Sequence, residues 1–249
     1  MKFKDYFSGH AGQYARFRPG YPETLFSYLA RLAPTRELAW DCATGNGQAA
    51  IGLAAHFERV IATDASSQQI ESAAPHARVE YRVAPAENSR LPADSVDLVT
   101  AAQALHWFDV SAFFAEAERV LKPGGVIAVW AYNLLSISRE VDALVNRFYS
   151  ETTAPFWPPE RAIVEAGYSD IRFPFEEISP PRFEMETRWR LDELVGYLRT
   201  WSATQRYIAS RGSDPVIPLV DELRKVWDGE ELRRLVRWPL ALRIGIKSD

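Results

Sequence analysis

The chain has 249 residues, of which 47% are hydrophobic and 25% charged. This composition is close to the average of soluble globular proteins, so it excludes a disordered or fibrous chain. The formal net charge of -4 gives no electrostatic reason to expect a nucleic-acid or membrane partner. The single cysteine, Cys42, excludes an internal disulfide and a multi-cysteine metal site, and the first residues lack the apolar run of a signal peptide. We expect a cytoplasmic protein without a bound metal, either a monomer or a homodimer.

The elements predicted first alternate between helices and short apolar strands. An apolar helical pattern at Leu25, Leu29 and Leu32 comes first and ends at Pro34. Strands are then predicted at residues 37–41, 60–64, 79–83, 95–100 and 126–131, with helices at 48–57, after Ser66, and at 110–121. This order favours an α/β fold with a doubly wound, Rossmann-like, mostly parallel sheet. Such sheets bind ligands at the carboxyl ends of their strands.

The last third of the chain no longer alternates short strands and helices. Helical patterns are predicted at residues 136–149, 191–210 and 216–227, strands at 183–190 and 240–246, and a loop rich in proline and aromatic residues at 153–159. No linker interrupts the chain, so we expect a single domain over residues 1–249. Within it, residues 1–35 would form an N-terminal lid, 36–132 the cofactor-binding core, and 133–249 the substrate-side helices and the last strands.

The loop after the first strand carries the first functional signal. Small residues between Asp41 and Gln48 allow a ligand to approach the backbone closely, although a Gly-x-Gly loop is also found in ordinary turns. Asp64 ends the second strand, where a carboxylate can accept both hydroxyls of a ribose. Its alternative role is a helix cap, which Ser66 can also fill. A nucleotide-like cofactor is indicated, and the loop alone leaves open whether it is a dinucleotide or S-adenosylmethionine, since Ala50 holds the third glycine position.

Five segments together resemble one enzyme family. They are residues 14–22, residues 41–47, Asp64, Ala86-Glu87, and Leu121-Lys122-Pro123-Gly124-Gly125 following Gln103-Ala104-Leu105-His106-Trp107-Phe108. In these segments the chain resembles the class I S-adenosylmethionine-dependent methyltransferases, type 11, in the small-molecule branch that includes trans-aconitate methyltransferase-like proteins. The resemblance implies a seven-stranded sheet whose last strand is antiparallel, and S-adenosylmethionine as the cofactor, with S-adenosylhomocysteine as its product.

The resemblance also implies which residues bind the cofactor. They are Tyr14, Arg18, Asp41, Ala43, Gly45, Gly47, Asp64, Ala65, Ala86, Glu87, Gln103 and His106. Ala43 stands where the family usually has glycine, and alanine tolerates a positive φ poorly, so the loop is expected to sit slightly differently. Tyr14 and Arg18 would act from the lid, although the same segment could simply pack against the edge of the sheet.

His106 is the candidate catalytic residue, either as a general base or as a donor that positions the substrate. A carboxylate acceptor would need no base. Aromatic residues make up 12% of the chain, and eight residues are tryptophan. Those expected to line the substrate pocket are Trp107, Trp130, Tyr132, Trp157 and Trp201. Trp40, Trp189, Trp227 and Trp238 are expected in the core.

We therefore predict methyl transfer to an oxygen atom of a small molecule, with a carboxylate as one candidate acceptor. Two alternatives stay open. One is a nicotinamide-dependent oxidoreductase, which would bind a dinucleotide. The other is a non-catalytic protein that has the same fold and binds the cofactor without turnover.

Overall fold

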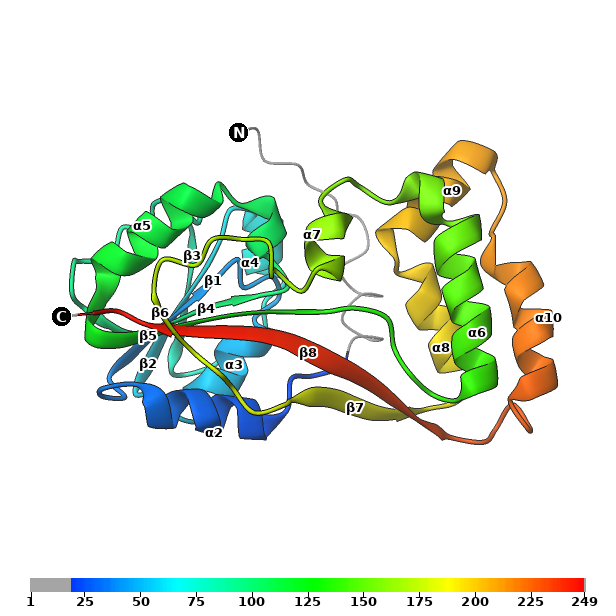
Figure 1. The fold of residues 1–249 in the computed structure, drawn as a ribbon, viewed down its shortest axis with the longest axis horizontal. Coiled ribbons are helices and arrows are strands. Elements are labelled where there is room, and N and C mark those ends of the chain that lie inside the picture. Colours follow the sequence, from blue (N-terminus) through cyan, green and yellow to red (C-terminus); the bar gives the residue numbers. More distant parts are fainter. Residues whose placement is uncertain (1–18, 249) are drawn as a thin grey trace.

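The computed structural model describes residues 19–248. Five parallel strands form the first part of the sheet: β1 (Leu38–Cys42), β2 (Arg59–Asp64), β3 (Val79–Val83), β4 (Val96–Ala102) and β5 (Leu121–Tyr132). They lie in the order β3-β2-β1-β4-β5, as the alternation of apolar strands and helices predicts (Figure 1). β5 begins before its predicted start at residue 126, because Leu121 already pairs with Val96 and a register irregularity follows.

The last strand, β8 (Arg234–Ile246), extends the sheet beyond β5. It runs antiparallel to β5, from Val126 opposite Ile246 to Tyr132 opposite Leu240. On its other side lies the short strand β6 (Glu176–Ile178), which was not predicted. The expected antiparallel last strand is thus confirmed, with the order β5-β8-β6.

β7 (Glu184–Trp189) pairs with the first half of β8. The two strands form an arm that leaves the main sheet and reaches the helical half of the molecule (Figure 1). The described residues therefore contain eight strands, one more than the seven predicted. β8 is longer than the predicted 240–246 because its first half belongs to this arm.

Helices cover both faces of the sheet. α2 (Glu23–Leu32) and α3 (Gln48–Ala54) pack on one face, and α5 (Val110–Val120) packs on the other. α4 (Ser67–Glu71) lies against β2 and β3, and the Ser66 hydroxyl accepts a hydrogen bond from the Gln69 N–H, as expected of an N-cap. α2 belongs to the segment expected to act as a lid, but its apolar stripe is buried against the sheet.

Trp130 follows the same two-face rule. Along β5, Ala128 and Trp130 belong to the cluster under α2, whereas Val129 and Ala131 belong to the cluster under α5. Trp130 is fully buried there and meets the Tyr21 ring edge-on at a centroid distance of 5.3 Å. Trp130 was predicted to line the substrate pocket, but it does not. Side chains alternate along a strand, and this one faces α2.

The helical half contains α6 (Arg139–Arg147), α8 (Leu191–Arg199), α9 (Ser202–Arg211) and α10 (Val216–Val226). The helix predicted over residues 191–210 is in fact two, because the chain turns at Thr200 and Trp201. Trp189, Trp227 and Trp238 are buried in the core of this half, and Trp40 is buried in the sheet half, as predicted. A further short helix, α7 (Arg161–Glu165), was not predicted and lies between the two halves in Figure 1.

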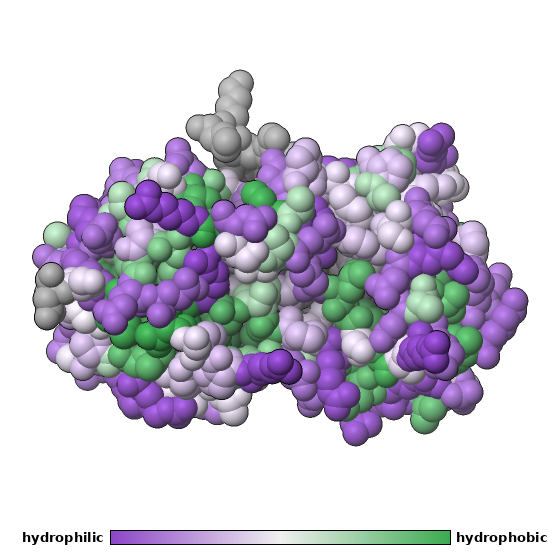
Figure 2. Space-filling view, viewed as in Figure 1, coloured by the Kyte–Doolittle hydropathy of each residue, from purple (hydrophilic) through white to green (hydrophobic). Residues whose placement is uncertain are grey.

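The outer surface is mixed in character. Figure 2 shows hydrophilic residues on both halves of the molecule with smaller hydrophobic groups between them. The exposed large hydrophobic side chains of the described residues, Val83, Ile217 and Leu232, belong to separate elements. No helix within residues 19–248 has the length and apolar character needed to cross a membrane.

Candidate functional site

A cavity of about 910 Å³ opens at the carboxyl ends of the five parallel strands, β1 to β5. Its sheet side is lined by the loops after these strands, and its other side by residues of the helical half. Most of the residues expected to bind the cofactor or the substrate line it: Ala43, Gly45, Asp64, Ala65, Ala86, Glu87, Gln103, His106, Trp107, Tyr132, Trp157 and Trp201. Tyr14 and Arg18 lie outside the described residues.

The loop after β1 makes a left-handed turn. Ala43, Gly45 and Gly47 all have positive φ values, of 53°, 57° and 89°. Ala43 therefore adopts a left-handed conformation that residues other than glycine rarely take, in spite of its side chain. Gly47 precedes α3 and does not line the cavity, although the sequence suggested that it would.

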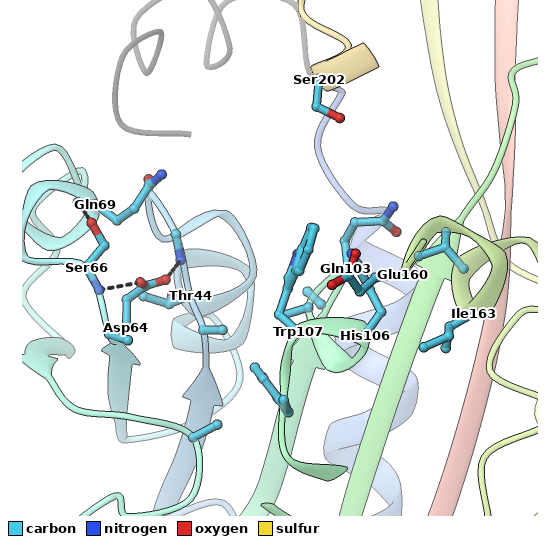
Figure 3. A pocket seen from close by; sticks show the side chains of 18 of the residues that line it. Thr44, Asp64, Ser66, Gln69, Gln103, His106, Trp107, Glu160, Ile163 and Ser202 are labelled. Carbon is cyan, nitrogen blue, oxygen red and sulfur yellow. Dashed lines mark hydrogen bonds between the residues drawn. The ribbon is translucent and has the colours of Figure 1, made fainter. Parts of the chain in front are cut away.

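Asp64 connects this loop to the end of β2. Its Oδ2 atom accepts a hydrogen bond from the Gly45 N–H at 2.9 Å, and its Oδ1 atom accepts one from the Ser66 N–H at 2.9 Å. The side chain is largely buried but still lines the cavity. Figure 3 shows Asp64 with Thr44, Ser66 and Gln69 on one side of the cavity, opposite Gln103, His106, Trp107 and Glu160.

Asp41 lies behind the loop and not on the cavity wall. Its two carboxylate oxygens accept hydrogen bonds from the Thr44 hydroxyl at 2.6 Å and from the Thr100 hydroxyl at 2.7 Å. Burial raises the pKa of Asp41 to about 6, against the opposing effect of these hydrogen bonds. The position indicates a residue that holds the loop in shape from below.

Gln103 directly follows β4 and has a positive φ of 55°. Its side-chain amide is tied to the next strand, because Oε1 accepts from the Tyr132 N–H at 2.7 Å and Nε2 donates to the Tyr132 carbonyl at 3.2 Å. These two bonds hold the ends of β4 and β5 together at the floor of the cavity. Next to them, the Glu87 carboxylate accepts from the Asp109 N–H at 3.0 Å and so links the loop after β3 to the start of α5.

His106 lies in the turn after β4. Its Nδ1 atom is 3.1 Å from the Tyr168 hydroxyl, and its ring lies 4.6 Å from that of Trp107, centroid to centroid. Burial, helped by the positive charge of Arg161, lowers the pKa of His106 to about 3. The ring is therefore neutral at physiological pH.

Aromatic side chains form the wall opposite the cofactor loop. Trp157 contacts the rings of Tyr149 and Trp201, with centroid distances of 4.9 Å and 5.6 Å. The Arg161 guanidinium lies 5.3 Å from the Tyr149 ring centroid and 5.1 Å from that of Trp157. The wall thus combines aromatic rings with the positive charge of Arg161, and Glu160 lines it next to Arg161.

Several residues of this wall were missed in the sequence: Tyr149, Glu160, Arg161, Tyr168 and Tyr197. Tyr168 touches the site through His106, and the others line the cavity directly. Tyr149 lies in the helical turn at residues 148–152, Glu160, Arg161 and Tyr168 lie in or next to α7, and Tyr197 lies in α8; no motif marks any of them. The one available signal is the sequence Trp157-Pro158-Pro159-Glu160-Arg161, in which two charged residues follow an aromatic, proline-rich loop.

The site fits the S-adenosylmethionine that the sequence motifs imply. The cavity offers a carboxylate, Asp64, for the ribose hydroxyls, and a second carboxylate, Glu87, at the next loop. Small residues, Ala65 and Ala86, leave room for a flat base between them, and the turn at Ala43 and Gly45 exposes backbone to a ligand. Of the residues predicted for the cofactor, Asp64 lies on one side of the cavity, whereas Gln103 and His106 lie on the opposite side with Trp107.

Gly47→Ala tests the shape of the loop. A Cβ atom at Gly47 would lie 2.3 Å from the Tyr81 hydroxyl, in addition to the strain of its positive φ. We expect the free energy of unfolding, measured by urea titration, to fall by about 2 kcal/mol. Gly212→Ala is the matched control, because Gly212 also has a positive φ but open space around it. Equal losses in the two variants would show that the contact with Tyr81 does not matter.

Comparison with known proteins agrees with this geometry. A family model described as a methyltransferase domain matches residues 40–129. A Dictyostelium discoideum protein described as a methyltransferase is 34% identical, with 99% of this chain and 97% of that protein covered. The Saccharomyces cerevisiae protein CRG1, described as an S-adenosylmethionine-dependent methyltransferase, is 29% identical over 92% of this chain and 91% of its own length.

A solved structure gives the same result. A structure described as that of a type II methyltransferase from Anaeromyxobacter dehalogenans superposes on this chain with a TM-score of 0.89. The two sequences are 47% identical, and the match covers 93% of this chain and 99% of that one. The narrower resemblance to trans-aconitate methyltransferases stays a prediction. The chain belongs to the type 11 family of class I methyltransferases, and its methyl donor is S-adenosylmethionine.

Proposed function

We propose that the enzyme transfers the methyl group to a carboxylate oxygen of a small organic acid. The observation that carries the proposal is the position of Arg161 in the aromatic wall. Among the described residues that line the cavity, Arg161 is the only lysine or arginine. A guanidinium between aromatic rings favours a carboxylate whose organic part packs against those rings.

Arg161 is held in place but keeps donors for a ligand. Its Nε donates to the Tyr149 hydroxyl at 2.7 Å and its Nη2 to the Asn133 side-chain oxygen at 3.2 Å. Glu165 is a more distant partner, 3.9 Å from Nε. The Nη1 group has no hydrogen-bond partner within residues 19–248. An arginine fixed in this way loses little conformational freedom when it binds an anion.

The chemistry also supports an acid. When bound, S-adenosylmethionine supplies a methyl group on a positively charged sulfur, and the leaving group is neutral. A carboxylate is ionised at neutral pH and attacks without a base, whereas an alcohol would have to lose a proton. His106, with a pKa of about 3, is a poor acceptor for that proton. Catalysis by this chain would then consist of holding the acid in line with the methyl group and excluding water.

An amine is the competing acceptor, and one observation favours it. Glu160 lines the same wall and carries a carboxylate that could attract an ammonium group. Glu160 is next to Arg161 in the sequence, so the wall carries one negative and one positive side chain, which favour ligands of opposite charge. The volume of the cavity, at the upper end of the ~300–1,000 Å³ of small-molecule sites, leaves room for a small acceptor of either class beside the cofactor.

A matched panel of acceptors separates the two. The enzyme is incubated with methyl-labelled S-adenosylmethionine and with aryl or alkyl carboxylic acids, their primary amides, and amines with the same carbon skeleton. We expect label in the acids alone, in a form that mild alkali releases, as a methyl ester requires. Label that is stable to alkali in the amines would overturn the proposal.

Arg161→Gln is the accompanying variant. We expect the KM for the acid to rise about 30-fold, because a charged hydrogen bond is lost, while binding of S-adenosylmethionine is unchanged. The KM of Arg161→Lys for the acid should lie between that of Arg161→Gln and that of the natural protein, because lysine keeps the positive charge but lacks the paired N–H donors of the guanidinium. Arg211→Gln removes an equal charge from the exposed end of α9 and serves as the control. An unchanged KM in Arg161→Gln would contradict the role of the guanidinium.

A further inference from the structure

We propose that Tyr168 fixes the neutral His106 ring with its proton on Nε2, so that His106 donates a hydrogen bond to the substrate and does not act as a base. The inference rests on the proposed function in taking this cavity as the substrate site. Tyr168 would be a positioning residue, since it contacts His106 and does not line the cavity.

Tyr168 is placed with unusual backbone geometry. It lies in the turn after α7, three residues beyond Glu165, and has a positive φ of 64°, next to Gly167 with a φ of 59°. A bulky residue in this conformation is rare and must be held there by its surroundings. Arg243 of β8 does so in part, because its Nη1 donates to the Tyr168 carbonyl at 2.8 Å. The strained turn directs the phenol ring into the core beneath His106.

Within the described part of the chain, the Tyr168 hydroxyl has one side-chain acceptor to donate to. Tyr168 is fully buried, and among the described residues the side-chain partner of its hydroxyl is His106 Nδ1, at 3.1 Å. If Nδ1 carried the ring proton, it would donate to the phenol oxygen, and the hydroxyl proton would be buried without an acceptor. Buried polar groups are almost always satisfied. The hydroxyl therefore donates to Nδ1, and a neutral ring then carries its proton on Nε2.

The surroundings of the pair agree with this arrangement. Burial raises the pKa of Tyr168 well above its usual range, so the hydroxyl keeps its proton. The backbone N–H groups of Leu105 and His106 interact with the phenol oxygen from the side of the turn, so a protonated Nδ1 would be a third donor to the same oxygen. The rings of Tyr168 and His106 lie at an interplanar angle of 29° with centroids 6.2 Å apart, which keeps the imidazole from rotating freely.

What remains for a substrate is the Nε2–H group. His106 lines the cavity, and Nε2 has no hydrogen-bond partner within residues 19–248. Figure 3 shows the ring beside Gln103 and Glu160, on the side opposite Asp64. A donor at this point would bind one carboxylate oxygen of the acceptor and leave the other to attack. An acid thus gains orientation from His106 in addition to the charge of Arg161.

Nitrogen-15 NMR of histidine-labelled protein tests the proton position directly. The sample is measured alone and with S-adenosylhomocysteine, and His106 is assigned by comparison with His106→Gln. We expect Nδ1 to be unprotonated and Nε2 protonated near neutral pH, and Tyr168→Phe to show a mixture of the two forms. Tyr28→Phe removes a hydroxyl from α2, away from the cavity, and should leave the spectrum unchanged. A proton on Nδ1 in the natural protein would overturn the proposal.

Two amide variants test the role in turnover. The amide nitrogen of glutamine reaches about as far as Nε2, whereas that of asparagine corresponds to Nδ1. With the acid acceptor as substrate, we expect His106→Asn to lower kcat about 100-fold, as loss of a donor to a reacting oxygen does, and His106→Gln to lower it much less. Tyr168→Phe should lower kcat about 10-fold, like other losses of an orienting partner, with the KM for S-adenosylmethionine unchanged.

Equal losses in His106→Gln and His106→Asn would contradict the donor role. The NMR measurement needs no acceptor, so it separates this inference from the proposed function. If no acid is methylated but the proton is on Nε2, the proposed acceptor is wrong and the tautomer stands. If acids are methylated but the proton is on Nδ1, the tautomer is wrong and the proposed function stands.

Discussion

Replacing Asp64 by alanine should weaken the binding of S-adenosylhomocysteine about 100-fold, which corresponds to about 2.7 kcal/mol. The variant would lose the carboxylate that we expect to accept the ribose hydroxyls. It would also leave the N–H groups of Gly45 and Ser66 without their acceptor, so the cofactor loop would lose its link to β2. A charged hydrogen bond contributes about 1.5–3 kcal/mol, and one such bond already accounts for the effect.

Isothermal titration calorimetry measures the change. Asp64→Asn keeps one side-chain oxygen, and its affinity for S-adenosylhomocysteine should fall about 10-fold, since that oxygen cannot accept from two N–H groups and from the ribose. Glu118→Ala removes a carboxylate from the exposed face of α5 and serves as the control. Thermal unfolding of all three variants without ligand shows whether the loss lies in the fold. A loss of less than threefold in Asp64→Ala would mean that the carboxylate holds the loop only.

Asp41 should make the stability of the ligand-free protein depend on pH. Its pKa is about 6 in the folded protein, against 3.8 for the free side chain. The folded state therefore keeps the proton over a pH range in which the unfolded state has lost it, and stability falls as the pH rises. The contribution is fully present below about pH 4 and is lost as the pH passes 6, a change of about 3 kcal/mol.

Asp41→Asn isolates this contribution. The amide does not titrate, and any cost of its altered hydrogen bonds to Thr44 and Thr100 is independent of pH. Between pH 4 and pH 8, the unfolding free energy of the natural protein relative to the variant should fall by about 2.4 kcal/mol in guanidinium titrations without cofactor. Parallel curves for the two proteins would show that Asp41 titrates normally.

The cofactor half could be predicted from the sequence in some detail. Each strand there is a short apolar run that ends at a polar or small residue, so β2 was expected to end at Asp64, as it does. Side-chain direction was harder to assign. Tryptophan is a residue type common in substrate pockets, but a shift of one position along β5 changes the face on which its side chain lies. The sequence around Trp130 is apolar on both faces, so it does not indicate which face that is.

The substrate half could not be predicted to the same depth. Arg161 reaches the cavity from a five-residue helix, and Tyr168 reaches His106 from a left-handed turn; neither element has a periodic signal. The break between α8 and α9 was also hidden, because Thr200 and Trp201 are compatible with a continuous helix. Contacts between segments far apart in the chain decide these positions, and local propensity has little influence on them.

The pairing of β8 has a consequence for how the chain folds. This strand is the last element in the sequence, yet it lies between β5 and β6 and supplies Arg243, which holds the turn at Tyr168. Until residues 234–246 have left the ribosome, β5 presents an unpaired edge and the substrate wall lacks its support. Closing the sheet requires contacts of long sequence separation, which form slowly. The cofactor loops can thus assemble during synthesis, whereas the substrate half must wait for residues 234–246.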